Sequence, residues 1–149
     1  MLTTLTHTEI AEVFHNNYIG RIGFRDDDRI YITPVNYIYE NDMVLCQSYE
    51  GLKVSLMRQY PQVCFEVEEL RYSNDWKTVI GWGVFEELNN AADIDYARSR
   101  LWEVMLAQKA GLATPPPAQE TMVHGVPHTA VVYYRIRFSE LSGRMEKRI

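Results

Sequence analysis

A serine, a glycine and a lysine stand close together in the sequence, at Ser48, Gly51 and Lys53. Together they could bind a phosphate, because a hydroxyl donates a hydrogen bond, glycine lets the main chain approach and lysine supplies positive charge. The N–H groups at the start of a helix would add to such a site. Alternatively, Ser48 caps a helix and Lys53 is solvated. Glu50 would repel a phosphate, so we expect its side chain to point outward.

A strand-like run just before this segment contains a proline. In Thr33, Pro34, Val35 and Asn36, the proline cannot donate to a strand ladder, so it predicts a place where strand pairing is interrupted. Interrupted pairing leaves main-chain groups free for the edge of a flat ligand, and the side chains of Thr33 and Asn36 could add hydrogen bonds. Gln47 could supply a second amide. The alternative is a kinked edge strand in which Asn36 is satisfied locally.

The elements that must position these residues are mostly strands. A capping box at Thr6 and Glu9 predicts the start of a helix over 8–17. A second helix is predicted over 51–60, where Pro61 ends it. Asn89 or Asn90 caps a long third helix, and Gly111 ends it. Strands are predicted over 18–24, 29–39, 43–47, 62–69, 76–88 and 129–139. We expect prolines 115–117 to form a linker and the tail 143–149 to fray. Two glycines within 76–88 predict a bulge, as closing a small barrel requires. The expected fold is α+β and mainly β, a six-stranded antiparallel barrel with flanking helices.

Composition limits the function classes. The chain of 149 residues is expected to form a single domain, 1–149, and its net charge of −5 argues against nucleic-acid binding. There is no apolar stretch of about 18 residues that could span a membrane, and residues 1–6 lack the pattern of a signal peptide. Cys46 and Cys64 are expected to be buried thiols, which favours a cytoplasmic location.

Other reactive residue types form no convincing site. Residues 26–28 are three aspartates that we interpret as a solvated hairpin tip, because no further ligands lie nearby. His124 and His128 flank Pro127, which disfavours the helix that a metal-binding pair at this spacing would need. We therefore expect no metal site, and we assign no catalytic residue. Serine-hydrolase and Walker motifs are absent from the sequence.

Five segments in a fixed order carry a family resemblance. They are Gly20-Arg21-Ile22-Gly23-Phe24, Thr33-Pro34-Val35-Asn36-Tyr37, Ser48-x-x-Gly51-x-Lys53, Pro61 to Val67, and Trp76-Lys77-Thr78-Val79. This order resembles the pyridoxamine 5'-phosphate oxidase-like FMN-binding split barrels, and most of all the branch that includes nitroimidazole-resistance proteins. The resemblance covers residues 9–88 and returns weakly at 131–144. Many relatives carry histidine where this chain has Gln47.

The resemblance implies a homodimer with FMN in clefts between the subunits. Lys53 would hold the phosphate, and Trp76 and Thr78 are candidates for contacts from the partner subunit, unless they belong to the core or the interface. Arg21 would touch the phosphate or pair with an acid on a neighbouring strand. Either histidine, His124 or His128, could line a substrate mouth or ligate haem, which some relatives handle.

The implied function is that of an FMN-dependent oxidoreductase. It would transfer electrons from a donor such as a nicotinamide to a small, aromatic or nitro-aromatic molecule. Pyridoxamine phosphate is not the expected substrate, because residues 142–149 do not reproduce the Arg- and His-bearing segment of the true oxidases. The alternatives are a non-catalytic protein that stores or senses FMN, haem or another flat ligand, and a dimeric interaction module that has lost its ligand.

Overall fold

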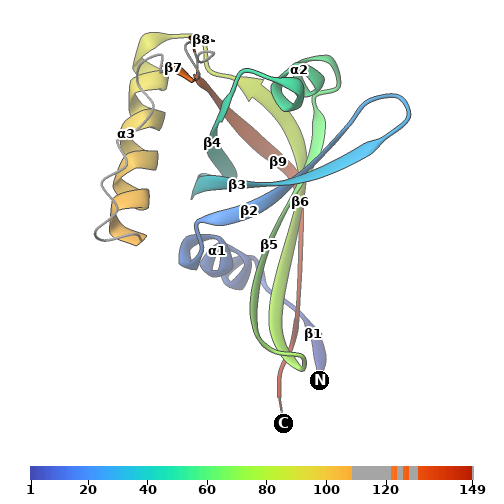
Figure 1. Cartoon of the computed structure of the whole chain (residues 1–149). Helices are drawn as coiled ribbons and strands as arrows, with labels where there is room; N and C mark the ends of the chain where they lie inside the picture. The colour runs from blue at the N-terminus through green and yellow to red at the C-terminus, as the bar shows by residue number, and fades with distance from the viewer. Residues whose placement is uncertain (109–121, 124–125, 128–130, 149) are drawn as a thin grey trace.

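The chain folds into a sheet of long strands with three helices (Figure 1). The computed structural model describes residues 1–108, 122–123, 126–127 and 131–148. The helices are α1 (His7–Asn16), α2 (Leu52–Gln59) and α3 (Ala91–Gln108). The strands are β1 (Leu2–Thr4), β2 (Ile19–Arg25), β3 (Ile30–Glu40), β4 (Met43–Tyr49), β5 (Gln62–Tyr72), β6 (Asp75–Glu87), β7 (Met122–Val123), β8 (Val126–Pro127) and β9 (Val131–Glu146).

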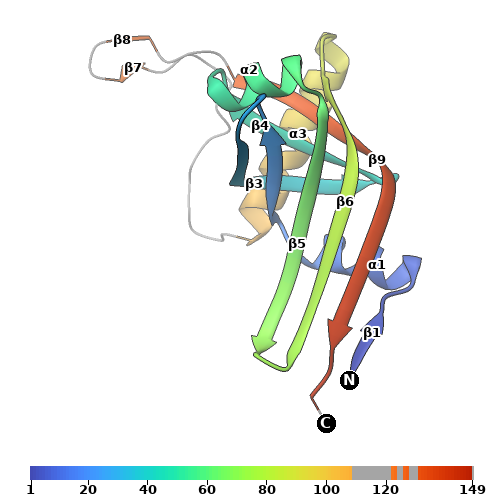
Figure 2. The ribbon, with the colours of Figure 1, turned by 90° about the vertical axis from the view of Figure 1, so that its right-hand side faces the viewer.

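Six of the strands close into a ring. Their order is β9-β4-β3-β2-β5-β6, and β6 pairs back with β9, which completes the ring. Every pairing is antiparallel, and β1 adds to β9 outside the ring. This arrangement is a split β-barrel, so the expected fold class is confirmed. Figure 2 shows β5, β6 and β9 running side by side as a long ribbon beyond α1.

Helix α1 closes one end of the barrel. Thr6 and Glu9 form the predicted capping box, since each side chain accepts a hydrogen bond from the other's main-chain N–H. Ile10, Val13 and Phe14 recur on one face and are buried in the barrel core.

A second, smaller core lies outside the barrel, under α3. Alternation along the strands turns Ile38, Leu45 and Tyr133 outward, where they pack with Ala97 and Leu101 of the helix. Asn90 caps α3 by accepting a hydrogen bond from the Asp93 N–H at 2.8 Å. Ala97 and Leu101 lie on the apolar face of this helix and are buried.

The two glycines of β6 mark a bulge, as predicted. The register between β6 and β9 shifts between Trp82 and Gly83. A Cβ atom on Gly83 would lie 2.0 Å from the carbonyl oxygen of Arg137, so only glycine fits where the two main chains approach.

The structure differs from the sequence-based expectation at both ends of the chain. Residues 143–146 do not fray, because they belong to β9 and pair with both β1 and β6. Strand β1 was not predicted, since three residues carry too little periodicity. The expectations for Gly111, prolines 115–117, His124 and His128 lie outside the described residues. In the part of the chain that the structure describes, no helix is both long and apolar enough to cross a membrane.

Candidate functional site

The barrel is split between β3 and β4. The two strands pair from Glu40 opposite Met43 to Tyr37 opposite Cys46, and the pairing ends there. Beyond that point, residues 30–36 of β3 pair only with β2, while residues 47–49 of β4 pair with β9. The interruption expected at Pro34 is therefore present, just beyond the last β3–β4 pair.

The open edge of β3 carries the main-chain groups of Pro34 and Asn36. The Tyr37 N–H donates to the Tyr18 carbonyl on the β2 side at 3.0 Å. Because successive residues of a strand point their main-chain groups to opposite edges, Pro34 and Asn36 direct theirs away from β2. Pro34 has no N–H, so its position at this edge leaves one donor fewer to be satisfied.

Two predicted site residues have polar atoms without partners. Thr33 Oγ1 and Gln47 Oε1 are both shielded from solvent and form no hydrogen bond within the described part of the chain. An unpaired buried polar atom destabilises a protein by about 1–3 kcal/mol, and most buried polar atoms are paired. Thr3, Arg98 and Tyr133 carry the other such side-chain atoms among the described residues. In addition, no side-chain hydrogen bond of Asn36 occurs within the described residues. The structure thus places three side chains with spare hydrogen-bonding capacity beside the split.

Helix α2 begins next to β4 without a side-chain cap. Its N-cap residue is Gly51, and no side chain bonds to its first N–H groups in the part of the chain described. A Cβ atom on Gly51 would meet its nearest heavy atom at 3.9 Å, so the space in front of this glycine is open. Its φ of 176° is extended and does not require glycine. An uncapped helix start with open space in front of it suits an anion.

Lys53 lies in the first turn of α2 and points toward the interior. Burial lowers the pKa of its ammonium, and the nearby Cys46 thiol partly offsets this effect. The same burial raises the pKa of Cys46, which lies on the inward face of β4 two residues before Ser48. No carboxylate lies within 4.0 Å of the Lys53 ammonium among the described residues. Lys53 is therefore a half-buried cation without an acidic partner.

Two polar residues that precede Lys53 in the sequence form hydrogen bonds with other side chains. Ser48 Oγ lies 2.9 Å from the hydroxyl of Tyr134, on β9. The Glu50 carboxylate accepts two hydrogen bonds from Arg58, at 2.7 and 2.9 Å. Arg58 also binds Glu87 at 2.6 Å, which ties α2 to the end of β6. Glu50 is thus neutralised by a cation and drawn toward the far end of α2, in agreement with the expectation that it points away from the lysine.

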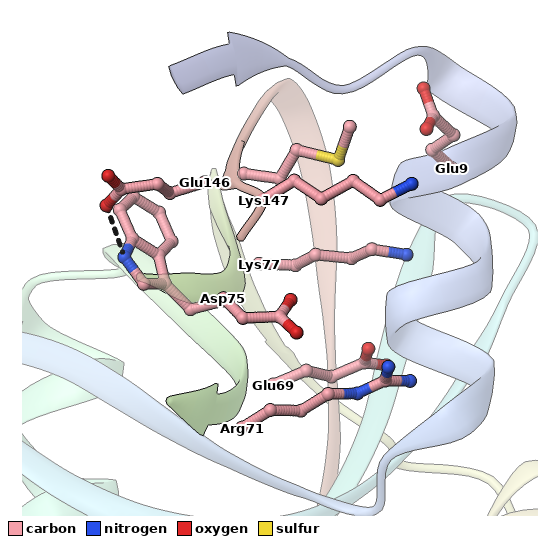
Figure 3. A pocket seen from close by; sticks show the side chains of 9 residues that line it. Glu9, Glu69, Arg71, Asp75, Lys77, Glu146 and Lys147 are labelled. Carbon is pink, nitrogen blue, oxygen red and sulfur yellow. Dashed lines mark hydrogen bonds between the residues drawn. The ribbon is translucent and has the colours of Figure 1, made fainter. Parts of the chain in front are cut away.

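Trp76 and Thr78 lie in another part of the molecule. The Trp76 indole donates to Glu146 at 3.1 Å, and the Thr78 hydroxyl donates to Glu66 at 2.9 Å. Trp76 lines a cavity of about 280 Å³ between α1 and the tip of the β5–β6 ribbon (Figure 3). Charged side chains of both signs surround it, including Glu69, Arg71 and Lys77. Within one chain, the structure does not bring Trp76 and Thr78 to Lys53.

The remaining candidate, Arg21, pairs with acids. Its guanidinium lies 3.2 Å from Glu68 and 3.5 Å from Glu66, so of the two alternatives the structure shows the ion pair with a neighbouring strand.

Sequence reasoning missed Tyr134 and Arg58 as neighbours of the site. The alternation of β9 places Tyr134 on its inward face, but only the register of β4 against β9 brings it to Ser48.

Comparison with known proteins identifies the family. The family model described as pyridoxamine 5'-phosphate oxidase matches residues 6–145, so this chain belongs to that family. Among curated proteins, an uncharacterized protein of Rhizobium meliloti is 27% identical over 130 residues, which cover 85% of this chain and 83% of that protein.

Solved structures share the fold. A FAD-binding protein of Mesorhizobium loti is 26% identical, with a TM-score of 0.76, and the match covers 99% of this chain and 98% of that one. A candidate 5-nitroimidazole antibiotic resistance protein of Bacteroides thetaiotaomicron is 17% identical, with a TM-score of 0.73, and the match covers 97% of this chain and 87% of that one. At that identity the second likeness concerns the fold alone.

Proposed function

We propose that this protein binds FMN and acts as an oxidoreductase on a small molecule. One observation carries the proposal. The split between β3 and β4 opens next to an uncapped helix start and a half-buried lysine that has no acidic partner in the described chain. A phosphate would complete that end of the site, and the similar FAD-binding protein supports a flavin as the ligand.

The residues present fit a flavin phosphate. Ser48 offers a hydroxyl, the start of α2 offers N–H groups, and Lys53 offers charge. The open space in front of Gly51 is the space that a Cβ atom would fill. FMN ends in a phosphate monoester, whereas in FAD the phosphate continues into a diester. A monoester carries more charge for the lysine and the helix start to stabilise, so we favour FMN.

The residues along the split fit the polar edge of a flavin ring. The main-chain groups of Pro34 and Asn36 face the open edge, with Val35 holding the strand in the core. Thr33 and Gln47 have unpaired polar atoms on either side of the split. A bound flavin supplies two-electron transfer, and the protein residues hold and orient it.

We further propose a homodimer in which the partner completes the site. Ile30 and Ile32 are 78% and 69% exposed on the outward face of β3, next to the split. The two side chains are at alternate positions and share one face of the strand, and contiguous exposed apolar surface marks protein interaction sites. In this arrangement Trp76 and Thr78, which are distant from Lys53 within a chain, reach the site from the partner subunit.

The substrate and the electron donor belong to the same proposal. We propose a small, aromatic or nitro-aromatic substrate and a reduced nicotinamide as donor, because the family combines this fold with flavin chemistry.

The absorption spectrum of the purified protein, with FMN, FAD or haemin added in turn and then desalted, tests the cofactor. Retained flavin bands with tighter binding of FMN than of FAD would support the proposal. A haem band, or no retained colour, would contradict it. Anaerobic bleaching of the bound flavin by NADH or NADPH then tests the donor, and a flavin that neither bleaches would support the non-catalytic alternative.

A further inference from the structure

Tyr134 and Ser48 form a hydrogen bond deep in the site. The Tyr134 side chain is completely buried, and its ring packs against Phe85 with the centroids 5.0 Å apart. Its hydroxyl lies 2.9 Å from Ser48 Oγ, and Ser48 is its one hydrogen-bond partner in the described part of the chain.

The direction of this hydrogen bond follows from the burial. A phenol has one proton to donate, and a buried donor without an acceptor is unfavourable. Ser48 Oγ is the acceptor within reach, so Tyr134 donates and Ser48 accepts. Burial also raises the pKa of Tyr134, so the phenol keeps this proton.

The serine proton must then point elsewhere. A serine hydroxyl that accepts one hydrogen bond still has its own proton to donate. In the described structure, no acceptor other than the Tyr134 oxygen lies within hydrogen-bond distance of Ser48 Oγ. Ser48 is half-buried at the end of β4 next to α2, so its proton is available to an anion held there.

We propose that Tyr134 is a positioning residue that fixes Ser48 as a hydrogen-bond donor to the phosphate of the bound flavin. Through this contact the site prefers FMN to riboflavin, which lacks the phosphate. The inference rests on the proposed function. It adds two successive hydrogen bonds: Tyr134 donates to Ser48, and Ser48 donates to the phosphate.

The test compares FMN with riboflavin on the flavin-free protein by fluorescence titration. Tyr134→Phe should weaken FMN binding about three- to tenfold, because a neutral hydrogen bond is lost. Riboflavin affinity should stay unchanged. In a Ser48→Ala background, Tyr134→Phe should have no further effect on FMN, because its action passes through the serine.

Tyr37→Phe is the matched control. Tyr37 is equally buried, but its hydroxyl donates to the Phe14 carbonyl at 2.7 Å, away from Ser48. This variant should lower the thermal midpoint and leave the ratio of FMN to riboflavin affinity unchanged. If Tyr134→Phe weakens both flavins equally, its role is structural and the inference fails. It also fails if FMN binding does not change.

Ser48 variants keep the inference testable should Tyr134→Phe not fold. Ser48→Thr retains the hydroxyl and should retain the preference for FMN, whereas Ser48→Ala should lose most of it. Ser48→Ala should also lower the thermal midpoint of the flavin-free protein by about 2–4 °C, because the phenol proton loses its acceptor. An unchanged midpoint would overturn the assigned direction. Wild-type protein that binds both flavins equally would also refute the inference, whereas wild-type protein that binds neither would refute the proposed function itself.

Discussion

No acidic side chain neutralises the charge of Lys53 within the residues that the structure describes. Burial lowers the pKa of its ammonium, which means that the folded, flavin-free protein is less stable with Lys53 charged than with it neutral. A phosphate would reverse this effect. Lys53→Met should therefore weaken FMN binding about ten- to a hundredfold, since a charge-assisted hydrogen bond is lost, while raising the thermal midpoint of the flavin-free protein. Titration and thermal unfolding measure the two effects separately.

The effect of Lys53→Met on stability should depend on pH in a definite direction. A lysine with a lowered folded-state pKa reduces stability when it is charged, and the reduction disappears as the pH rises toward the unfolded value of about 10.4. The thermal midpoint of Lys53→Met should thus exceed that of the wild type by most near neutral pH, and the difference should shrink at alkaline pH. Lys147→Met, which removes the same charge from an exposed position far from α2, is the control for the stability of the flavin-free protein. A Lys53→Met protein that is less stable than the wild type at pH 7 would count against a desolvated ammonium.

A substitution at Gly51 should affect FMN binding with little effect on the stability of the fold. Its main chain is extended and the position of a Cβ atom is open, so the fold itself does not require glycine here. Gly51→Ala should change the free energy of unfolding by no more than about 1 kcal/mol. It should nevertheless weaken FMN binding, because the methyl group would occupy the space of the phosphate. Equal FMN affinity of the two proteins would show that the phosphate does not approach this residue.

At the scale of elements, the bulge in β6 is the place where the barrel tolerates least change. A Cβ atom on Gly83 would stand 2.0 Å from a main-chain oxygen, which cannot move aside as a flexible side chain could. Gly83→Ala should therefore lower the free energy of unfolding by about 3 kcal/mol or more, as measured by urea denaturation. Gly51→Ala serves as the matched glycine control. Similar denaturation midpoints for the two variants would refute the close approach.

The elements that could be predicted from the sequence are those with strong periodicity or end signals. The capping box at Thr6 and Glu9 located α1, and the alternation of Val63, Phe65 and Val67 located β5. The end of β9 could not be predicted, because residues 143–146 include a glycine and two charged side chains and show little strand periodicity. They are ordered by pairing with β1 and β6, which are distant in sequence.

The site was predictable only where its residues are close in sequence. Ser48, Gly51 and Lys53 lie on one strand end and the following helix, and the structure places them at the same end of the barrel. Pro34 predicted the interrupted pairing because proline lacks an N–H. The Tyr134 contact depends on strand register, and the position of Trp76 far from Lys53 depends on the length of the β5–β6 ribbon. Neither follows from local pattern.

At the scale of the whole molecule, the proposed binding groups lie at two separate places. Lys53 belongs to α2 and Ser48 to the adjoining end of β4, whereas Trp76 belongs to the start of β6. Figures 1 and 2 show α2 at one end of the molecule and the tip of the β5–β6 ribbon at the other, beyond α1. In the proposed arrangement, one chain would supply the groups for the flavin phosphate together with part of those for the ring edge. A second copy that packs its ribbon across the split would bring the remaining groups to the flavin.

The exposed isoleucines of β3 test this assembly. Ile32→Glu would place a charge within an apolar interface, where its desolvation is unfavourable, so the dimer should dissociate. Ile32 is 69% exposed in the single chain, so the fold should tolerate the change. Size-exclusion chromatography with light scattering measures the mass, and titration of the same sample measures FMN affinity. Leu106→Glu, at a 41% exposed position on α3, is the control. If the partner completes the site, Ile32→Glu should be monomeric and should also have lost most of its FMN affinity. A monomeric variant that binds FMN as tightly as the wild type would show that one chain suffices.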